Sequence, residues 1–185
     1  MSEIMIEELR DRGMIDLKGD PAAPGFREAV ASVLGLDLPL APRTSATMGA
    51  ITVLWLSIDQ WLITLPHADA APLAERLQAA LAGHHALVVD LSDARAVFRI
   101  TGRGAREVVM KGASADLTHK DYRAGTVRRL SFAELAAMVH EVSDDPEILD
   151  LYVFRSVGHY AHAFLETASR PEARVLLWGR EANSE

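Results

Sequence analysis

The sequence predicts an α+β fold, a mostly antiparallel sheet with helices on one face. Two observations predict it: short apolar strands come in neighbouring pairs joined by tight turns, and amphipathic helices lie between those pairs. Paired strands favour antiparallel hairpins, whereas a parallel doubly wound sheet needs a helix after every strand. The 185 residues fit one domain, and 49% apolar residues suffice for a sizeable core.

Three parts are expected along the chain. Residues 1–13 are charged and only weakly periodic, which predicts a loosely ordered N-terminal arm. Residues 14–170 carry the predicted elements and form the expected single α+β domain. Residues 171–185 begin at a proline that ends the last helix, and they are expected to be a C-terminal tail.

The first half of the domain predicts one short strand, one helix and one hairpin. A strand is expected at 14–17, followed by a helix at 26–34 whose apolar residues repeat every three or four positions, with Gly35 ending it. Residues 50–57 and 60–65 are rich in β-branched and aromatic residues, so they predict two antiparallel strands around a tight turn.

The second half predicts further helices and strands. Asp69 is expected to cap a helix with Pro72 in its first turn, and Gly83 to end it. Strands are expected at 86–91, 95–101, 126–130 and 148–154, the first two joined as a hairpin, with a short helix at 102–112. Residues 134–142 fit either a helix or a strand. The last helix is expected to follow Ser156 as its cap.

Composition excludes several classes of protein. The formal net charge is −7, and basic residues are not interleaved with aromatics as nucleic-acid binding requires. The chain has no cysteine, which excludes disulfides and thiolate sites, and no apolar run approaches the roughly 20 residues of a membrane span. We therefore expect a cytoplasmic protein that binds neither nucleic acid nor membrane.

Two polar groups are candidates for chemistry. His159, His162 and Glu166 project from one side of the last predicted helix, a set that suits zinc or iron but also suits an ordinary solvent face. Asp90, Asp93 and Arg95 lie in a turn, where Asx bonding at Asp93 and an ion pair to Arg95 explain them without catalysis. We expect neither a catalytic residue nor a metal site.

Three tryptophans are candidates for a protein interface. Trp55 and Trp61 flank the predicted hairpin turn, and Trp178 lies in an apolar island of the tail. On a strand such residues are core aromatics unless they are exposed, in which case they favour a binding hot spot.

Five blocks of the sequence resemble signatures of the gamma subunits of heterotetrameric sarcosine oxidases. The first, W-L-S-I-D-Q-W-L at 55–62, is similar to W-L-G-P-D-E-W-L. The other four blocks lie at 89–95 (V-D-L-S-D-A-R), 101–106 (T-G-R-G-A-R), 111–117 (K-G-A-S-A-D-L) and 153–156 (V-F-R-S). Ser57-Ile58 stands where the family has Gly-Pro, and Ala113-Ser114 where it has Cys-Pro. These departures leave open a paralogue that serves another N-methyl amine oxidase.

The resemblance implies a fold similar to one folate-binding module of the glycine-cleavage T protein. It also implies a complex that demethylates sarcosine to glycine, with tetrahydrofolate accepting the one-carbon unit and peroxide as a product. In such complexes alpha, beta and delta subunits are the partners and hold FAD, FMN, NAD and tetrahydrofolate. The gamma chain itself binds no cofactor and packs around the one-carbon-transfer module, with self-association of the isolated chain left open.

A second hypothesis is a stand-alone module that binds folate or a related pterin. It requires a concave pocket with aromatic walls and a carboxylate for the pterin ring. Asp90, Asp116 and Arg155 are the candidate residues for that site.

Overall fold

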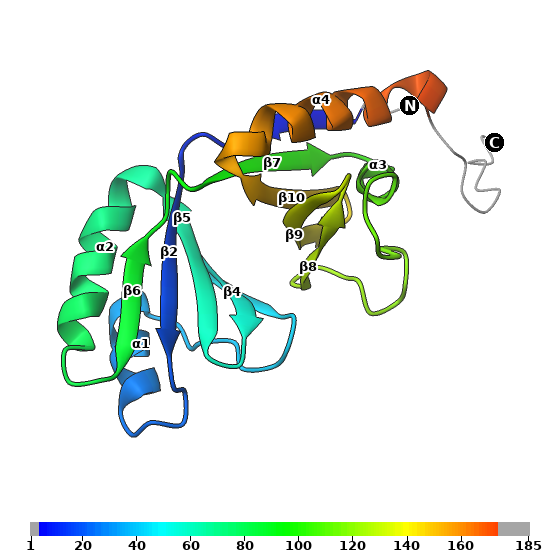
Figure 1. The fold of residues 1–185 in the computed structure, drawn as a ribbon. Helices are drawn as coiled ribbons and strands as arrows, with labels where there is room; N and C mark the ends of the chain where they lie inside the picture. The colour runs from blue at the N-terminus through cyan, green and yellow to red at the C-terminus, as the bar shows by residue number, and fades with distance from the viewer. Residues whose placement is uncertain (1–3, 174–185) are drawn as a thin grey trace.

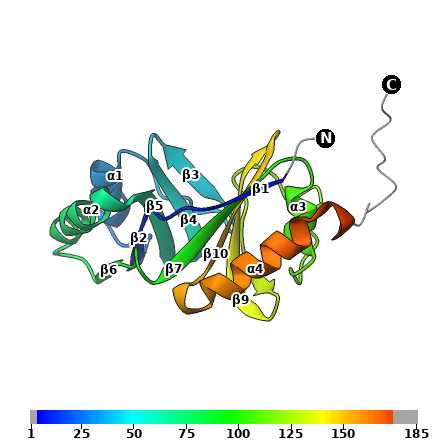
Figure 2. The ribbon, with the colours of Figure 1, turned by 90° about the horizontal axis from the view of Figure 1, so that it is seen from above.

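The structure is a computed structural model that describes residues 4–173. Two five-stranded antiparallel sheets lie face to face, and each carries helices on its outer side. Figure 1 shows the strands of one sheet upright and those of the other nearly horizontal, so the two sets cross steeply. Seen from above in Figure 2, α1 and α2 lie at one end of the molecule and α4 runs along the other. The α+β class with mostly antiparallel strands is confirmed, but the strands divide between two sheets.

Sheet 1 has the strand order β3-β4-β5-β2-β6. Its centre is the predicted hairpin, in which Trp55 is the register partner of Trp61. At the turn, the Ser57 hydroxyl donates to the Asp59 carboxylate (2.5 Å), which ties the two residues on either side of Ile58. The strands are β2 (Arg12–Gly19), β3 (Ser45–Met48), β4 (Ile51–Ser57), β5 (Gln60–Pro66) and β6 (Ala86–Asp90).

Two helices cover the outer face of sheet 1. Helix α1 (Phe26–Leu34) ends as predicted at Gly35, whose φ of 74° is left-handed and whose amide donates to the Ala31 carbonyl (2.8 Å). Helix α2 (His67–Ala80) begins directly after Pro66, so Asp69 lies within its first turn and the prediction of a cap there is wrong. Both helices bury an apolar stripe against Trp61 and its neighbours.

Sheet 2 has the strand order β1-β7-β10-β9-β8, with two helices and two short 3₁₀ turns on its outer side. The open question at 134–142 is settled in favour of a strand, β9. The strands are β1 (Met5–Glu8), β7 (Arg95–Thr101), β8 (Val127–Phe132), β9 (Leu135–Asp144) and β10 (Glu147–Phe154). The helices are α3 (Ala105–Met110) and α4 (Gly158–Ser169), and the 3₁₀ turns are η1 (Arg155–Val157) and η2 (Pro171–Ala173).

A third core joins the inner faces of the two sheets. Sheet 1 contributes Met14, Leu54 and Leu62 to it, and Tyr152 and Met138 lie opposite them on sheet 2. The molecule therefore has an inner apolar layer between the sheets and an outer apolar layer under each helix pair.

Three further expectations are wrong, each for a reason that only tertiary structure supplies. Residues 5–8 are no loose arm, because β1 pairs with β7 along its whole length. The expected hairpin of 86–91 with 95–101 does not form, because β6 belongs to sheet 1 and β7 to sheet 2. The prediction of Ser156 as the cap of the last helix is wrong, because Ser156 lies in η1 and Val157 is the residue that precedes α4. The expected tail lies, from residue 174 onward, outside the described residues.

Candidate functional site

A buried ion cluster lies between the two sheets. Asp150 on β10 is almost fully buried and accepts two hydrogen bonds from Arg99 on β7, Nε to Oδ1 at 2.7 Å and Nη2 to Oδ2 at 2.9 Å. Arg12 on β2 approaches the same carboxylate at 3.9 Å from the facing sheet. A buried carboxylate requires such partners, so this cluster holds the sheets in register.

His140 on β9 makes a second bridge between the sheets. Its Nε2 lies 3.0 Å from the hydroxyl of Ser45 on β3, and that hydroxyl donates to the Gly125 carbonyl at 3.0 Å. Because the hydroxyl hydrogen is used there, Nε2 carries the donating proton of a neutral imidazole. Burial, reinforced by the charges of Arg12 and Arg99, lowers the pKa of His140 from 6.5 to about 4.

A third charged group anchors α3 to the β9–β10 hairpin. Arg106 donates from Nε and Nη2 to Oε1 of Glu141, at 3.0 and 2.7 Å, and also to Asp144. Burial raises the pKa of Glu141, and Oε2 of its carboxylate has no hydrogen-bond partner among residues 4–173. These groups fix elements of the fold and do not line the pocket described below.

The crossover from sheet 1 to sheet 2 uses the turn that sequence singled out. Asp90, and not Asp93, makes the Asx bonds, since its Oδ1 accepts from the amide (2.9 Å) and hydroxyl (2.5 Å) of Ser92. Within the described chain Arg95 makes no ion pair with Asp93; its guanidinium lies over the Phe154 ring at 5.1 Å. Arg155 donates to the carbonyls of Asp93 (2.8 Å) and Arg95 (2.9 Å).

The structure does not bring the three folate candidates together. Asp90 and Arg155 both hold the crossover at residues 90–95, whereas Asp116 lies in the loop between α3 and β8. The first two therefore serve the turn, and only Asp116 lines a pocket.

The metal candidates are spread along an exposed helix face. His162 pairs with Glu166 at 3.7 Å and packs against the Phe98 ring at 5.5 Å between centroids. In residues 4–173 no set of three or more His, Asp or Glu side chains is arranged to hold a metal ion.

The interface candidates have different fates. Trp61 is completely buried, and its indole Nε1 donates to the Pro39 carbonyl at 2.8 Å, so the interpretation as an interface residue is wrong for it. Trp55 packs, half-buried, against the core under α1 and α2. Trp178 lies outside the described residues.

Apolar side chains are exposed where the inner faces of the sheets separate. Leu87 and Val89 on β6 are 48% and 36% exposed, and Phe154 at the end of β10 is 50% exposed. The guanidinium of Arg95 lies over the Phe154 ring and interacts electrostatically with Asp16, which is the register partner of Val89. We call these five residues the open edge.

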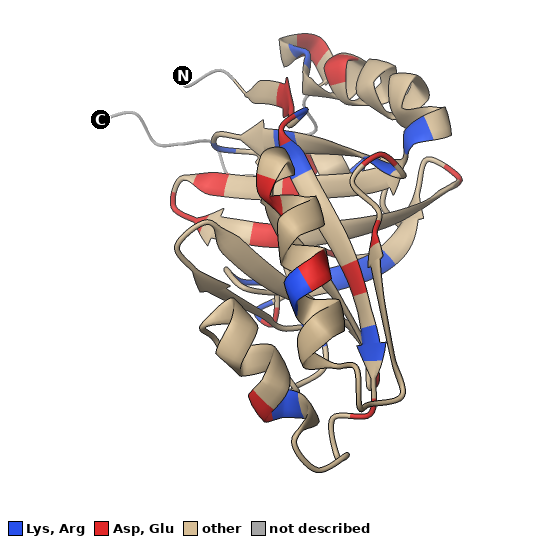
Figure 3. Cartoon of the chain, turned by 90° about the vertical axis from the view of Figure 1, so that its left-hand side faces the viewer, with Lys and Arg blue, Asp and Glu red and all other residues tan. Residues whose placement is uncertain are grey.

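The side of the molecule that carries β6 has charged residues of both signs, with neither sign predominating (Figure 3). In Figure 3 Lys and Arg are scattered among Asp and Glu over this side, with uncharged stretches along α2 and β6. This mixed distribution differs from the basic face of a nucleic-acid binder. Among residues 4–173, no helix is long and apolar enough to cross a membrane.

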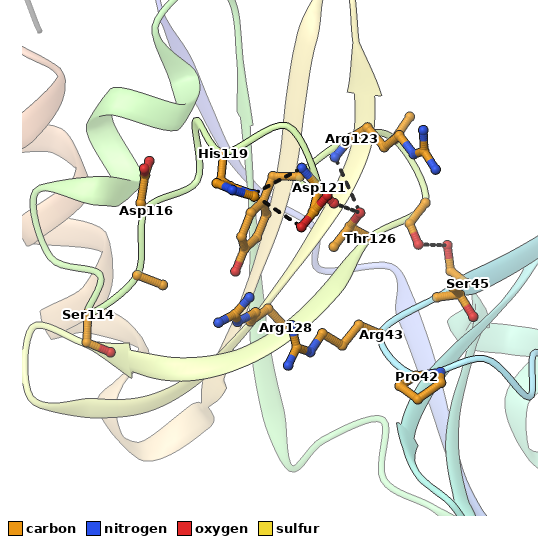
Figure 4. A pocket seen from close by; sticks show the side chains of 15 residues that line it. Pro42, Arg43, Ser45, Ser114, Asp116, His119, Asp121, Arg123, Thr126 and Arg128 are labelled. Atoms are coloured by element: carbon orange, nitrogen blue, oxygen red, sulfur yellow. Dashed lines mark hydrogen bonds and ion pairs between the residues drawn. The ribbon is translucent and has the colours of Figure 1, made fainter.

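A pocket of about 700 Å³ lies at the seam of the sheets, between the segment 42–45 and the loop 114–126. Figure 4 shows the polar side chains that line it, among them Arg43, Arg123 and Arg128. Sequence reasoning missed this site. Its only signal was the polar loop before β8, because the partner segment 42–45 lies about 70 residues away in the chain and meets that loop only in the fold.

Comparison with known proteins gives a consistent family. The family model described as "Sarcosine oxidase, gamma subunit family" matches residues 18–171. A sarcosine oxidase subunit gamma from Arthrobacter sp. is 31% identical over 115 residues, which is 62% of this chain and 55% of that protein. The matched region thus spans about half the length of this relative.

Solved structures agree on the fold. A chain of the heterotetrameric sarcosine oxidase from Corynebacterium sp. U-96 superposes with a TM-score of 0.83 at 23% identity, covering 93% of this chain and 86% of that one. The aminomethyltransferase T of the glycine cleavage system from Bartonella henselae gives 0.70 at 11% identity, covering 89% of this chain and 45% of that one. At these identities the likeness concerns the fold, and it confirms the expected T-protein-like module.

Proposed function

This chain belongs to the sarcosine oxidase gamma subunit family, and we propose that it is the non-catalytic gamma subunit of a heterotetrameric sarcosine oxidase. The observation that carries the proposal is the family match over residues 18–171, which includes strands β3 to β10 and helices α1 to α4. In the proposed complex sarcosine is demethylated to glycine, tetrahydrofolate accepts the one-carbon unit and peroxide forms. This chain packs against the one-carbon-transfer module of the large subunit.

The buried charged residues form hydrogen bonds within the chain, which supports a role in packing and not in catalysis. Asp150, Glu141 and His140 are the buried acidic and histidine side chains of residues 4–173, and each contacts a partner on another element of the fold. Groups tied in this way are poor acids and bases for an external substrate. We therefore assign FAD, FMN, NAD and tetrahydrofolate to the alpha, beta and delta subunits, in a cytoplasmic complex.

The open edge is the surface that we assign to partner contact. It combines three exposed apolar side chains with one arginine and one aspartate, and protein interfaces likewise combine apolar side chains with charged ones. Strand β6 is also the last strand of sheet 1, and the side chain of Gln78 donates to its Val88 carbonyl at 3.0 Å. That bond protects the strand edge from unspecific pairing while Leu87 and Val89 stay available on the face.

The test is a tagged pull-down of the chain from its native cell. We expect recovery of larger subunits with flavin absorbance, and peroxide formation that depends on sarcosine. Recovery of the chain alone and colourless contradicts the proposal and directs the next titration to tetrahydrofolate.

A matched pair of variants tests the surface. L87K together with V89K is expected to reduce recovery of the partners at least about tenfold, since it places two charges in an apolar contact. Met48 is 49% exposed on β3, at the opposite edge of the same sheet, so M48K is the control and is expected to recover partners normally. Equal recovery for both variants would remove the open edge from the interface.

A further inference from the structure

The pocket at the seam of the sheets is lined by three arginines that form no ion pair with a carboxylate of residues 4–173. Arg43 and Arg128 both line it, and Figure 4 shows Arg43 extending toward Arg128, whose guanidinium lies beside Tyr122, whereas Arg123 extends away from both. In residues 4–173 no carboxylate lies within ion-pair distance of any of the three. The charges of Arg43 and Arg128 both act to lower the pKa of Tyr122, so the two guanidinium groups lie near the same hydroxyl, where like charges repel unless negative charge joins them.

The acids near the pocket are engaged by their own loop. Oδ1 of Asp116 accepts from the amide (2.8 Å) and hydroxyl (2.6 Å) of Thr118, and these bonds lower the pKa of Asp116. Asp121 faces the His119 ring, Oδ2 to Nδ1 at 3.3 Å. In Figure 4 the Asp116 side chain points away from the two arginines. Both carboxylates therefore have their contacts within the loop, and neither is paired with an arginine of the pocket.

Tyr122 supplies a hydrogen-bond donor at the same place. Its side chain lines the pocket and is only 8% exposed, and its hydroxyl lies near the Arg128 side chain without forming a hydrogen bond of normal geometry to any of residues 4–173. The Arg128 guanidinium lies 5.2 Å from the centre of its ring. Burial raises the pKa of Tyr122, so the hydroxyl keeps its proton at neutral pH. A buried hydroxyl without a partner costs free energy, which a ligand acceptor would recover.

Backbone bonds fix the two arginines relative to each other. The Val127 amide donates to the Arg43 carbonyl at 2.9 Å, and the Ser45 amide donates to the Gly125 carbonyl at 2.8 Å. On the other side of the loop, the Ala124 amide donates to Oδ2 of Asp144 at 3.0 Å. The pocket is therefore built by tertiary contacts between the sheets, and ligand binding needs little reorganisation.

We propose that this pocket binds a small organic anion, with a phosphate or carboxylate group held between Arg43 and Arg128 and hydrogen-bonded by the Tyr122 hydroxyl. Guanidinium groups recognise both anions by charge-assisted hydrogen bonds. The cavity of about 700 Å³ exceeds the size of an inorganic ion and falls in the range of sites for small organic ligands. This site is separate from the open edge, so it stands whether or not the chain assembles with partners.

Calorimetric titration of the full chain with pyrophosphate and, separately, with citrate tests the proposal. We expect binding of at least one probe, with affinity reduced about tenfold or more in R43Q and in R128Q. Arg27 is exposed on α1, outside the pocket, so R27Q is the matched control and is expected to bind like the wild type. Tighter binding of pyrophosphate indicates a phosphate ligand, and tighter binding of citrate a carboxylate ligand.

Y122F keeps the test valid if an arginine variant fails to fold. It removes only the unpartnered hydroxyl, so we expect an equal or higher urea midpoint together with an affinity reduced by about threefold to tenfold. A merely structural tyrosine would change the urea midpoint and leave the affinity alone. Failure of both probes to bind the folded wild type, or wild-type affinity in R43Q, R128Q and Y122F, would overturn the proposal.

Discussion

The outer face of sheet 1 packs Trp61, Phe26 and Leu77 under two helices, whereas sheet 2 carries the buried acidic and histidine side chains of residues 4–173. Both sheets are five-stranded, antiparallel and covered by helices. Packing fixes sheet 1, and hydrogen-bonded charge pairs add to packing in sheet 2. The difference teaches that the sheets should respond differently to the same kind of substitution: sheet 1 to loss of volume, sheet 2 to loss of one charge.

The largest effect is expected at Trp61. W61A removes a completely buried ring and its hydrogen bond to Pro39, so we expect a loss of about 3–5 kcal/mol in the free energy of unfolding. Urea denaturation followed by circular dichroism measures it. W61F keeps most of the volume, and its cost should be well under half of that of W61A. Equal costs would mean that the hydrogen bond, and not packing, fixes sheet 1.

The next effect is expected at Asp150. D150N keeps the shape but leaves Arg99 and Arg12 without a carboxylate, so we expect a loss of about 2–4 kcal/mol, less than for fully buried arginines. The measurement is the same denaturation. V97A, which shortens an apolar neighbour on β7, is the comparison, and a smaller cost for D150N than for V97A would show that charge pairing adds little to sheet 2.

His140 provides a pH-dependent test of sheet 2. The folded chain holds the imidazole neutral down to about pH 4, whereas the unfolded chain binds a proton near pH 6.5. Stability from this group is therefore lost as pH falls from 6.5 toward 4, and between pH 7 and 5.5 the loss is about 1 kcal/mol. Urea midpoints across this range measure it. H140Q should flatten the slope, H159Q at the exposed His159 should not, and an unchanged slope in H140Q would contradict the assignment.

The sequence predicted the parts of this fold that depend on neighbours in the chain. The helix at 26–34 and the hairpin around Ile58 follow from local periodicity and turn chemistry, and both are confirmed. The division into two sheets was not predictable in this way, because the turn at residues 92–94 looks the same whether the next strand pairs with β6 or leaves for another sheet. Residues 5–8 looked like a loose arm because their only partner, β7, lies about 90 residues away.

The candidate site was less predictable than the fold. The turn at residues 90–95 was recognised, but the Asx bonds predicted for Asp93 are made by Asp90 to Ser92, a choice that depends on the crossover between sheets. Arg43, Tyr122 and Arg128 carried no signal, since no spacing rule connects a residue before β3 with residues around β8. A local sequence pattern predicts which face of a helix or strand is buried. It cannot predict this pocket, which forms only where the two sheets meet.

The smallest effect on stability is expected at the open edge, and strand β6 contains its own control. Leu87 is half exposed on the inner face of sheet 1, and its neighbour Val88 is buried under α2 on the outer face. L87K should change the free energy of unfolding by less than about 0.5 kcal/mol, because the ammonium group stays in water. V88K should cost about 3 kcal/mol or more, because it forces a charge into the apolar layer. Urea denaturation of the isolated chain measures both. A large cost for L87K would mean that Leu87 belongs to the fold, and of the apolar residues of the open edge only Val89 and Phe154 would then remain as candidates for partner contact.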